Sequence, residues 1–129
     1  MPRVVHFEIH ATDPDRLVAF YEGLFGWRIQ KWDGEWEYWM IVTGDNAEPG
    51  INGGLLRRQG AAAPAGQSVN AFVCTLDVPD VDDVLARLAE QGGTVAVPKM
   101  MVPGVGWLAY IKDPDGNILG VMQAESKTG

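Results

Sequence analysis

The fold of this chain is decided by the stretch from Val4 to Trp27, which reads VVHFEIHATDPDRLVAFYEGLFGW. Its opening residues alternate apolar and ionisable side chains at the two-residue period of a β-strand. The apolar set is Val5, Phe7 and Ile9, and the ionisable set is His6, Glu8 and His10. We therefore predict a strand over residues 4–11 with one apolar face and one ionisable face.

A helix is predicted directly after this strand. Thr12, Asp13 and Pro14 offer a side-chain oxygen for the cap and a proline in the first turn, where no backbone N–H is needed. Apolar residues then recur three and four positions apart along one stripe, which we expect to be buried: Leu17, Phe20, Tyr21 and Leu24. Gly26 is suited to end this helix in a left-handed conformation.

The rest of the first half predicts three more strands. Residues 27–32 and 35–42 form a hairpin, because Asp33-Gly34 is a dipeptide preferred in a tight two-residue turn. A polar loop follows, and residues 53–58 supply a short fourth strand. The order of elements is thus βαβββ.

The same order recurs after a linker at residues 59–68, which is rich in Ala, Gly and Pro. We expect a strand at 70–76, a helix capped by Asp80 that stops at Gly92-Gly93, and strands at 94–101, 106–112 and 118–123. A turn at 113–116, Asp-Pro-Asp-Gly, precedes the last strand. A shift of 67 positions lays the apolar face of the first strand on Phe72, Cys74 and Leu76, so Cys74 is expected to be a buried packing residue.

These elements predict an α+β fold of paired βαβββ modules, at about residues 4–58 and 69–123, in a single domain of residues 1–129. If a helix covers one face of each sheet, the other face must curl around a ligand or face its twin. We therefore expect a curved mixed sheet around a ligand-sized cup.

Composition narrows the classes of function. The 129 residues carry 47% hydrophobic and 21% charged side chains, as in a globular domain. A net charge of −7 argues against nucleic acid and anionic membranes as partners. The single cysteine excludes an intramolecular disulfide, and neither a signal peptide nor a membrane span is evident, so we expect a cytoplasmic protein.

Three segments resemble the vicinal oxygen chelate superfamily, which includes glyoxalase I, extradiol dioxygenases, fosfomycin-resistance enzymes and bleomycin-binding proteins. They are the opening stretch quoted above, DVDDVLARLAEQGG, and GWLAYIKDPDGNILGVMQ. The resemblance covers residues 4–123 and implies paired βαβββ modules that form a cup, usually within a homodimer.

The resemblance also implies four metal-ligand positions, of which this chain keeps one. His6 matches the first ligand, whereas the second falls near Gly53 or Gly54, the third near Val73 and the fourth on Gly120. Glycine and valine side chains offer no donor to a cation. No metal is therefore expected, although a divalent ion at His6 with Glu8 and further donors stays open.

His6 and Glu8 are the candidate catalytic residues, because a carboxylate can fix the tautomer of an imidazole and raise its basicity. A ligand-anchoring or purely structural pair is the alternative. The candidate ligand-binding residues are of two kinds. Some lie on the ionisable face of the strand or its equivalent, and the others are aromatic residues, whose rings suit flat, apolar ligands. They are His10, Trp36, Trp39, Thr75 and Trp107.

Two functional hypotheses follow from these residues. The first is a small-molecule-binding protein that holds an apolar or aromatic ligand without the full metal site. The second is a metal-dependent lyase or dioxygenase that uses His6 and Glu8.

Overall fold

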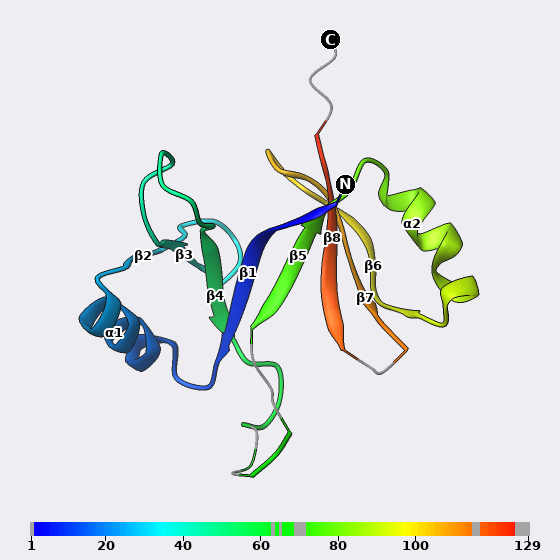
Figure 1. The fold of residues 1–129 in the computed structure, drawn as a ribbon. Helices are drawn as coiled ribbons and strands as arrows, with labels where there is room; N and C mark the ends of the chain where they lie inside the picture. Colours follow the sequence, from blue (N-terminus) through cyan, green and yellow to red (C-terminus); the bar gives the residue numbers. More distant parts are fainter. Residues whose placement is uncertain (1, 63, 65, 69–71, 115–116, 126–129) are drawn as a thin grey trace. The chain divides into compact units, whose positions relative to one another are not determined.

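The computed structural model describes residues 2–62, 64, 66–68, 72–114 and 117–125. Its contacts divide the chain into two compact units, one formed by His6–Phe72 and the other by the residues from Val73 onward with the start of the chain. Each unit contains one βαβββ module (Figure 1). The two predicted modules are therefore confirmed, and each is described by itself.

The first module contains β1 (Arg3–Ala11), α1 (Pro14–Phe25), β2 (Arg28–Lys31), β3 (Trp39–Val42) and β4 (Gly53–Arg57). Its strands lie in the order β2-β3-β4-β1. The β1–β4 pair is parallel, and the β3–β4 and β2–β3 pairs are antiparallel. The sheet is thus mixed, and its first and last strands in sequence are neighbours.

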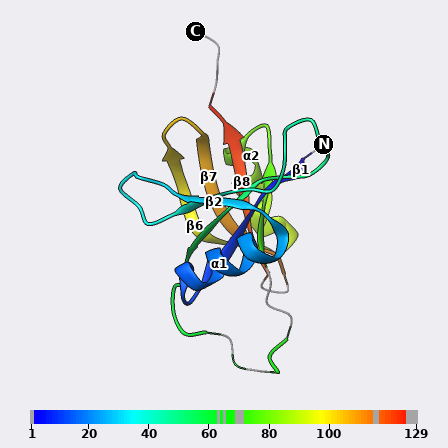
Figure 2. The same ribbon diagram turned by 90° about the vertical axis from the view of Figure 1, so that its left-hand side faces the viewer.

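Helix α1 begins and ends as the sequence predicts. The Asp13 side chain accepts a hydrogen bond from the Arg16 N–H at 3.3 Å, and Pro14 occupies the first turn. At the other end Gly26 is left-handed, with φ of 73°, and its N–H donates to the Glu22 carbonyl at 3.0 Å. The helix lies against the first sheet, where it contacts β2 and β4 (Figure 2).

The core of the first module lies between α1 and one face of the sheet. Its buried residues are Phe7, Ile9, Ala11, Trp39, Ile41 and Leu55, and the partly buried residues packed against them include Leu17, Val18 and Tyr21 of α1. The predicted buried stripe of α1 is wrong for Phe20 and Leu24, which are 52% and 61% exposed because the helix faces the core through Leu17, Val18 and Tyr21. Ile41 and Leu55 are fully buried, and burial of side chains of this size contributes about 1.5–3 kcal/mol each. The apolar face that alternation assigns to the first strand is confirmed as the helix-facing side at Phe7 and Ile9, whereas Val5 is 41% exposed.

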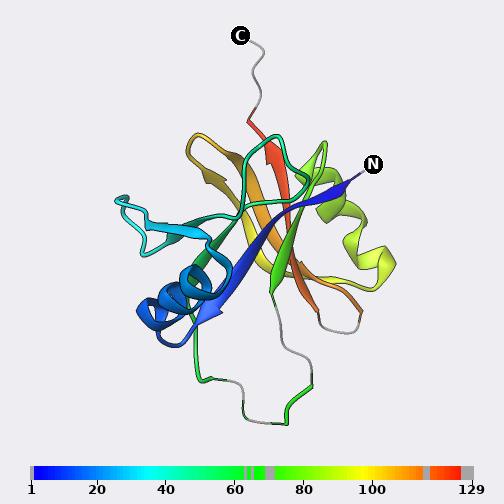
Figure 3. The same ribbon diagram turned by 60° about the vertical axis from the view of Figure 1, so that its left-hand side comes forward.

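The hairpin is confirmed, but its predicted two-residue turn is wrong. Lys31 pairs with Trp39, so seven residues connect β2 and β3. The Trp32 N–H donates to the Tyr38 carbonyl at 2.7 Å and closes the neck of this loop. A type I′ turn needs positive φ at both central residues, and neither Asp33 nor Gly34 has it. The loop extends beyond the two strands (Figure 3).

The second module contains β5 (Val73–Asp77), α2 (Val81–Leu88) with a 3-10 turn (Ala89–Gln91), β6 (Thr94–Val102), β7 (Gly106–Lys112) and β8 (Ile118–Ala124). Its strands lie in the order β5-β8-β7-β6, with β5 and β8 parallel. The predicted start of the first of these strands, at residues 70–71, and positions 115–116 of the predicted turn lie outside the described residues.

Helix α2 covers one face of the second sheet. The Asp80 side chain caps it by accepting from the Asp83 N–H at 3.3 Å, as predicted. The buried residues of this core are Val78, Val81, Ala109, Ile111 and Val121, and Leu76 packs against them. Cys74 lies two residues before Leu76 and hence on the same face, where it is half-buried.

The predicted α+β class and the order of elements are confirmed in both modules. The predicted cup depends on how the modules are arranged and stays a prediction. In the described part of the chain, the helices are too short or too polar to cross a membrane.

Candidate functional site

The candidate site is the face of the first sheet that points away from α1, which we call the polar face. Because side chains alternate along a strand, His6, Glu8 and His10 lie here, opposite Phe7 and Ile9. Glu8 is buried, with 8% of its surface exposed, whereas His6 and His10 are half-buried. The predicted catalytic pair therefore shares one face.

Tyr38, the last residue of the β2–β3 loop, joins this pair. Its side chain lies on the polar face, because the next residue, Trp39, points into the core. The Tyr38 hydroxyl forms a 3.0 Å hydrogen bond with Nε2 of His6, a residue 32 positions earlier in the chain. The fold thus brings an imidazole and a phenol into direct contact.

Gly54 makes room for the Tyr38 ring. It pairs with Glu8 on one side and with Met40 on the other, so it lies in the middle of the polar face. A Cβ atom on Gly54 would overlap the Tyr38 hydroxyl. The absence of a side chain at this position is therefore what allows the phenol to reach His6.

Burial holds both partners of this hydrogen bond in their uncharged forms. Desolvation lowers the pKa of His6 below its usual value of 6.5, and the nearby Glu8 partly opposes this effect. Desolvation raises the pKa of Tyr38 well above its usual value of 10, and Glu8 adds to that increase. At neutral pH the pair is a neutral imidazole bonded to a neutral phenol.

Such a pair has hydrogen-bonding capacity left for a ligand. A phenol has one donor and two lone pairs, and the bond to His6 uses only part of them. The neutral imidazole of His6 is also suited to accept a proton from a bound molecule. The polar face can therefore orient a small molecule and has one group able to act as a base.

Apart from His6, the residues at the metal-ligand positions that the resemblance implies do not fit a metal ion. On the polar face Tyr38 fills the space above Gly54 where a ligating side chain would stand. In the second module Val73 has no donor atom, and a Cβ on Gly120 would lie 2.7 Å from the Thr75 hydroxyl. Within the described ranges, no group of three or more His, Cys, Asp and Glu residues is placed to hold an ion.

Two further predicted ligand-binding residues of the first module lie on the polar face and in the β2–β3 loop. His10 shares the polar face, and its backbone carbonyl accepts from Arg58 at 2.9 Å. Trp36 lies in the β2–β3 loop with 56% of its surface exposed, and its ring centroid is 6.0 Å from that of Trp32. The loop that carries Tyr38 thus also carries an exposed pair of tryptophans.

Trp39 is not brought together with His6 and Glu8. Its ring belongs to the core on the α1 side of the sheet and is only 6% exposed, because Trp39 and Ile41 alternate with the residues of the polar face. The ammonium group of Lys31 lies 5.4 Å from the ring centroid. The sequence prediction grouped Trp39 with Trp36 by proximity in the chain, and alternation along β3 separates them.

Two predicted ligand-binding residues lie in the second module, on opposite faces of its sheet. Trp107 packs against the core on the α2 side, and the Lys99 ammonium group lies 4.5 Å from its ring centroid. Thr75 is buried on the other face, where it pairs with Gly120. Their part in ligand binding stays a prediction.

Tyr38 is the site residue that the sequence prediction did not select. The expected two-residue turn placed Tyr38 inside a strand, among several aromatic residues with no assigned direction. One signal was present: if Trp39 and Ile41 face the core, Tyr38 and Met40 face the other side. Its contact with His6 could not be read from either strand alone.

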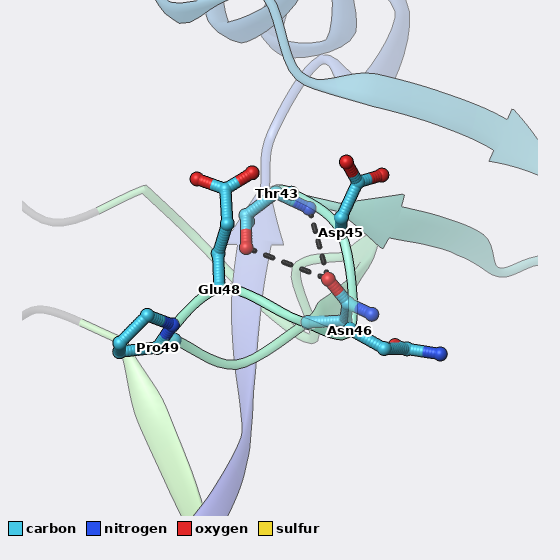
Figure 4. Close-up of a pocket in the computed structure, with 8 residues that line it drawn as sticks. Thr43, Asp45, Asn46, Glu48 and Pro49 are labelled. Atoms are coloured by element: carbon cyan, nitrogen blue, oxygen red, sulfur yellow. Dashed lines mark hydrogen bonds between the residues drawn. The ribbon is translucent and has the colours of Figure 1, made fainter.

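A small pocket lies elsewhere in the first module, in the loop between β3 and β4 (Figure 4). Thr43 holds this loop together, since its N–H donates to the Asn52 side-chain oxygen at 2.9 Å and its hydroxyl donates to the Ile51 carbonyl at 2.6 Å. Asp45 and Glu48 make the lining acidic. We assign no function to this pocket.

Comparison with known proteins identifies the family. The family model described as the Glyoxalase/Bleomycin resistance protein/Dioxygenase superfamily matches residues 3–121. Because the match spans both modules, the chain belongs to this superfamily, as the resemblance of its three segments implies.

Known relatives agree with this assignment. A protein of Mycobacterium bovis named "Putative glyoxylase CFP32" is 27% identical over 133 residues, which cover 95% of this chain. The match spans 46% of that protein, so the chain has about half the length of the curated relatives it matches.

Two solved structures show the same fold. A hypothetical protein from Bacillus halodurans superposes with a TM-score of 0.68 at 11% identity, over 99% of this chain and 98% of the other. Methylmalonyl-CoA epimerase from Mycobacterium tuberculosis gives 0.67 at 14% identity, over 96% and 89%. At these identities the likeness supports the fold alone.

Proposed function

We propose that this protein binds an apolar or aromatic small molecule on the polar face of its first module, without the family's full metal site. One observation carries the proposal: the Tyr38 hydroxyl stands above Gly54 and bonds to His6 at 3.0 Å. The position expected to hold a metal ligand instead holds an uncharged hydrogen-bonding group.

Apolar surface beside this group supports an apolar or aromatic ligand. Met40 lies next to Gly54 on the polar face with 42% of its surface exposed. Trp32 and Trp36, on the loop that ends at Tyr38, are 37% and 56% exposed. Exposed aromatic and methionine side chains beside a few polar groups are typical of small-molecule sites.

Fluorescence titration with a panel of flat aromatic molecules tests this proposal. Binding is expected to quench tryptophan emission, and Trp36→Ala should remove most of the response. Trp27→Phe is the control, because Trp27 stacks on Tyr21 on the helix side, with ring centroids 5.2 Å apart. No saturable quenching by any member of the panel would reject the proposal.

The second candidate is a metal-dependent lyase or dioxygenase that uses His6 and Glu8. It is favoured by the match of His6 to the first ligand position and by burial, which keeps this imidazole neutral as a metal ligand must be. It requires the His6–Tyr38 hydrogen bond to break and further donors to move toward His6.

Elemental analysis of the purified protein, with titration of nickel, iron and zinc, separates the two candidates. We expect weak, substoichiometric metal that His6→Ala leaves unchanged. Tight, stoichiometric metal that His6→Ala abolishes would favour the second candidate and reject the first.

We further propose that the protein is a cytoplasmic homodimer. Exposed apolar side chains of α1 support self-association, since Phe20, Leu24 and Phe25 are each more than half exposed. Light scattering during gel filtration tests the dimer: a mass of one chain across the micromolar range would contradict it.

A further inference from the structure

The Tyr38 hydroxyl lies on the polar face and is held there by its hydrogen bond with Nε2 of His6. The ring is only partly buried, and its neighbours on the polar face are Gly54 and Met40. If Nε2 of His6 donates to the phenol oxygen, the O–H is left to donate to a ligand. If Nε2 accepts, a lone pair is left to accept from a ligand.

A ligand group that both donates and accepts satisfies either arrangement. A primary amide does so, because its NH₂ donates and its carbonyl oxygen accepts. An apolar molecule of the same shape satisfies neither and leaves the remaining capacity of a half-buried phenol unused.

The charges around the hydroxyl disfavour a negatively charged ligand. Burial lowers the pKa of His6 and raises that of Tyr38; Glu8 is the charged residue that acts on both, opposing the first shift and adding to the second. A group that disfavours negative charge on the Tyr38 oxygen equally disfavours an anion bonded to that oxygen.

Basic side chains of this sheet lie away from the hydroxyl. Arg28 is on the same face, but β2 is two strands from β4, above whose Gly54 the hydroxyl stands, or about 10 Å at the usual strand spacing. Arg58, just beyond the end of β4, donates to the His10 carbonyl at 2.9 Å. Lys31 and Arg57 point to the other face, as their pairing with Trp39 and Ala11 shows.

We infer that Tyr38 is the specificity-determining residue of the polar face and selects an uncharged aromatic molecule bearing an amide or similar dipolar group over an anion of the same shape. This inference rests on the proposed function and deepens it, since it names the chemical class of the ligand. It assigns a role to a loop residue whose partner lies on a different strand.

Titration of the ¹⁵N-labelled chain, followed by two-dimensional NMR, tests the inference with three matched probes. Naphthalene-2-carboxamide, naphthalene-2-carboxylate and 2-methylnaphthalene share one ring system and differ in the polar group. We expect the carboxamide to shift the amide signals of His6, Gly54 and Met40 and to bind about tenfold more tightly than the carboxylate, the result of one hydrogen bond and one unfavourable charge pair.

Tyr38→Phe removes the hydroxyl and keeps the ring. It should weaken carboxamide binding about fivefold to tenfold, as expected for one hydrogen bond, and leave 2-methylnaphthalene binding unchanged. Tyr21→Phe is the matched control, because it removes a hydroxyl from α1 on the other side of the sheet, and it should change neither affinity. The spectrum of each variant, recorded before any probe is added, shows whether the variant is folded.

The outcomes separate this inference from the proposed function. If no probe shifts any signal of the polar face, the proposed function fails and the inference falls with it. If the probes bind there but the carboxylate binds as tightly as the carboxamide, or Tyr38→Phe binds the carboxamide like the wild type, the inference alone is overturned.

Discussion

The two modules have the same order of elements and differ in what they place on the face away from the helix. In the first module Glu8 pairs with Gly54, and in the second Thr75 pairs with Gly120. Both glycines leave space for a hydroxyl, that of Tyr38 in one and that of Thr75 in the other. The repeat thus preserves a glycine with a hydroxyl above it, while the titratable residues His6 and Glu8 belong to the first module.

The hydroxyls reach their glycines by different routes. Thr75 lies within strand β5 and is 2% exposed, so the backbone fixes its position. Tyr38 reaches Gly54 from a loop of seven residues, and its long side chain has more freedom to move. The first module therefore has the more adaptable surface, which is a property that ligand-binding sites need.

The largest effect is expected from the core of the first module. Leu55→Ala should lower the free energy of unfolding by about 2–5 kcal/mol, because Leu55 is fully buried and its removal leaves a cavity. Leu24→Ala, at a position 61% exposed, is the control and should change it by less than about 0.5 kcal/mol. Urea denaturation measures both, and similar losses would show that α1 does not cover Leu55 as described.

Alanine at the two equivalent glycines compares the modules directly. Gly120→Ala should cost about 2–3 kcal/mol, because its Cβ would lie 2.7 Å from the hydroxyl of the β-branched, buried Thr75. Gly54→Ala should cost about 1 kcal/mol, because the Tyr38 side chain can move away, but it should break the His6–Tyr38 hydrogen bond, a loss that the NMR signals of the two side chains would report. A larger loss of stability in Gly54→Ala than in Gly120→Ala would show that Tyr38 is not more adaptable than Thr75.

The pH dependence of stability should distinguish the first module. A folded-state pKa of His6 below 6.5 means that the unfolded chain binds a proton before the folded chain does, so stability is complete above pH 6.5 and is lost as the pH falls through the lowered value. The loss is expected on the acid side of pH 6.5 only, because the lowered pKa of His6 lies there.

Two histidine variants check this dependence by thermal unfolding between pH 5 and 7. His6→Gln should flatten the curve. His10→Gln removes the chain's other histidine but leaves the His6–Tyr38 bond in place, and should keep the slope. An unchanged slope in His6→Gln would assign the effect to other groups.

The smallest effects concern one exposed ion pair in each module. Lys99→Ala should lower stability by about 0.5–1 kcal/mol, because Lys99 pairs with Asp82 at 2.9 Å and also lies over the Trp107 ring. Arg57→Ala breaks the exposed pair with Glu37 and should leave the denaturation midpoint unchanged. Equal, measurable losses of stability in the two variants would show that the contact of Lys99 with the Trp107 ring does not contribute to stability.

Local patterns in the sequence were sufficient for much of the fold. Alternation identified the two faces of β1, and a side-chain oxygen with a proline and a later glycine identified both ends of α1. Each of these signals acts within a few residues, so neighbouring positions alone determine it. The same holds for the Asp80 cap of α2.

The candidate site was harder to predict because its contacts join distant residues. His6 and Glu8 were selected from one strand, and the fold places them together on one face. Tyr38, the partner of His6, is 32 residues away in the chain. It lies in a seven-residue loop, where the Asp33-Gly34 dipeptide had predicted a turn of two residues. The sheet face to which Trp39 and Trp107 point depends on the register of their strands, and the presence of several aromatic residues close together in the sequence does not determine that register.

The parallel pairing of β1 with β4 has a consequence for how the first module comes into being on the ribosome. Phe7 faces Gly53, so more than forty residues must emerge before this backbone ladder can close. Until then the apolar side of β1 can pack only against residues that precede β4, such as those of α1 and β3. Closing a chain segment of this length is entropically slow. The nascent module therefore cannot complete its sheet until β4 has been synthesised. Between the synthesis of β1 and that of β4, apolar side chains are exposed and can lead to aggregation.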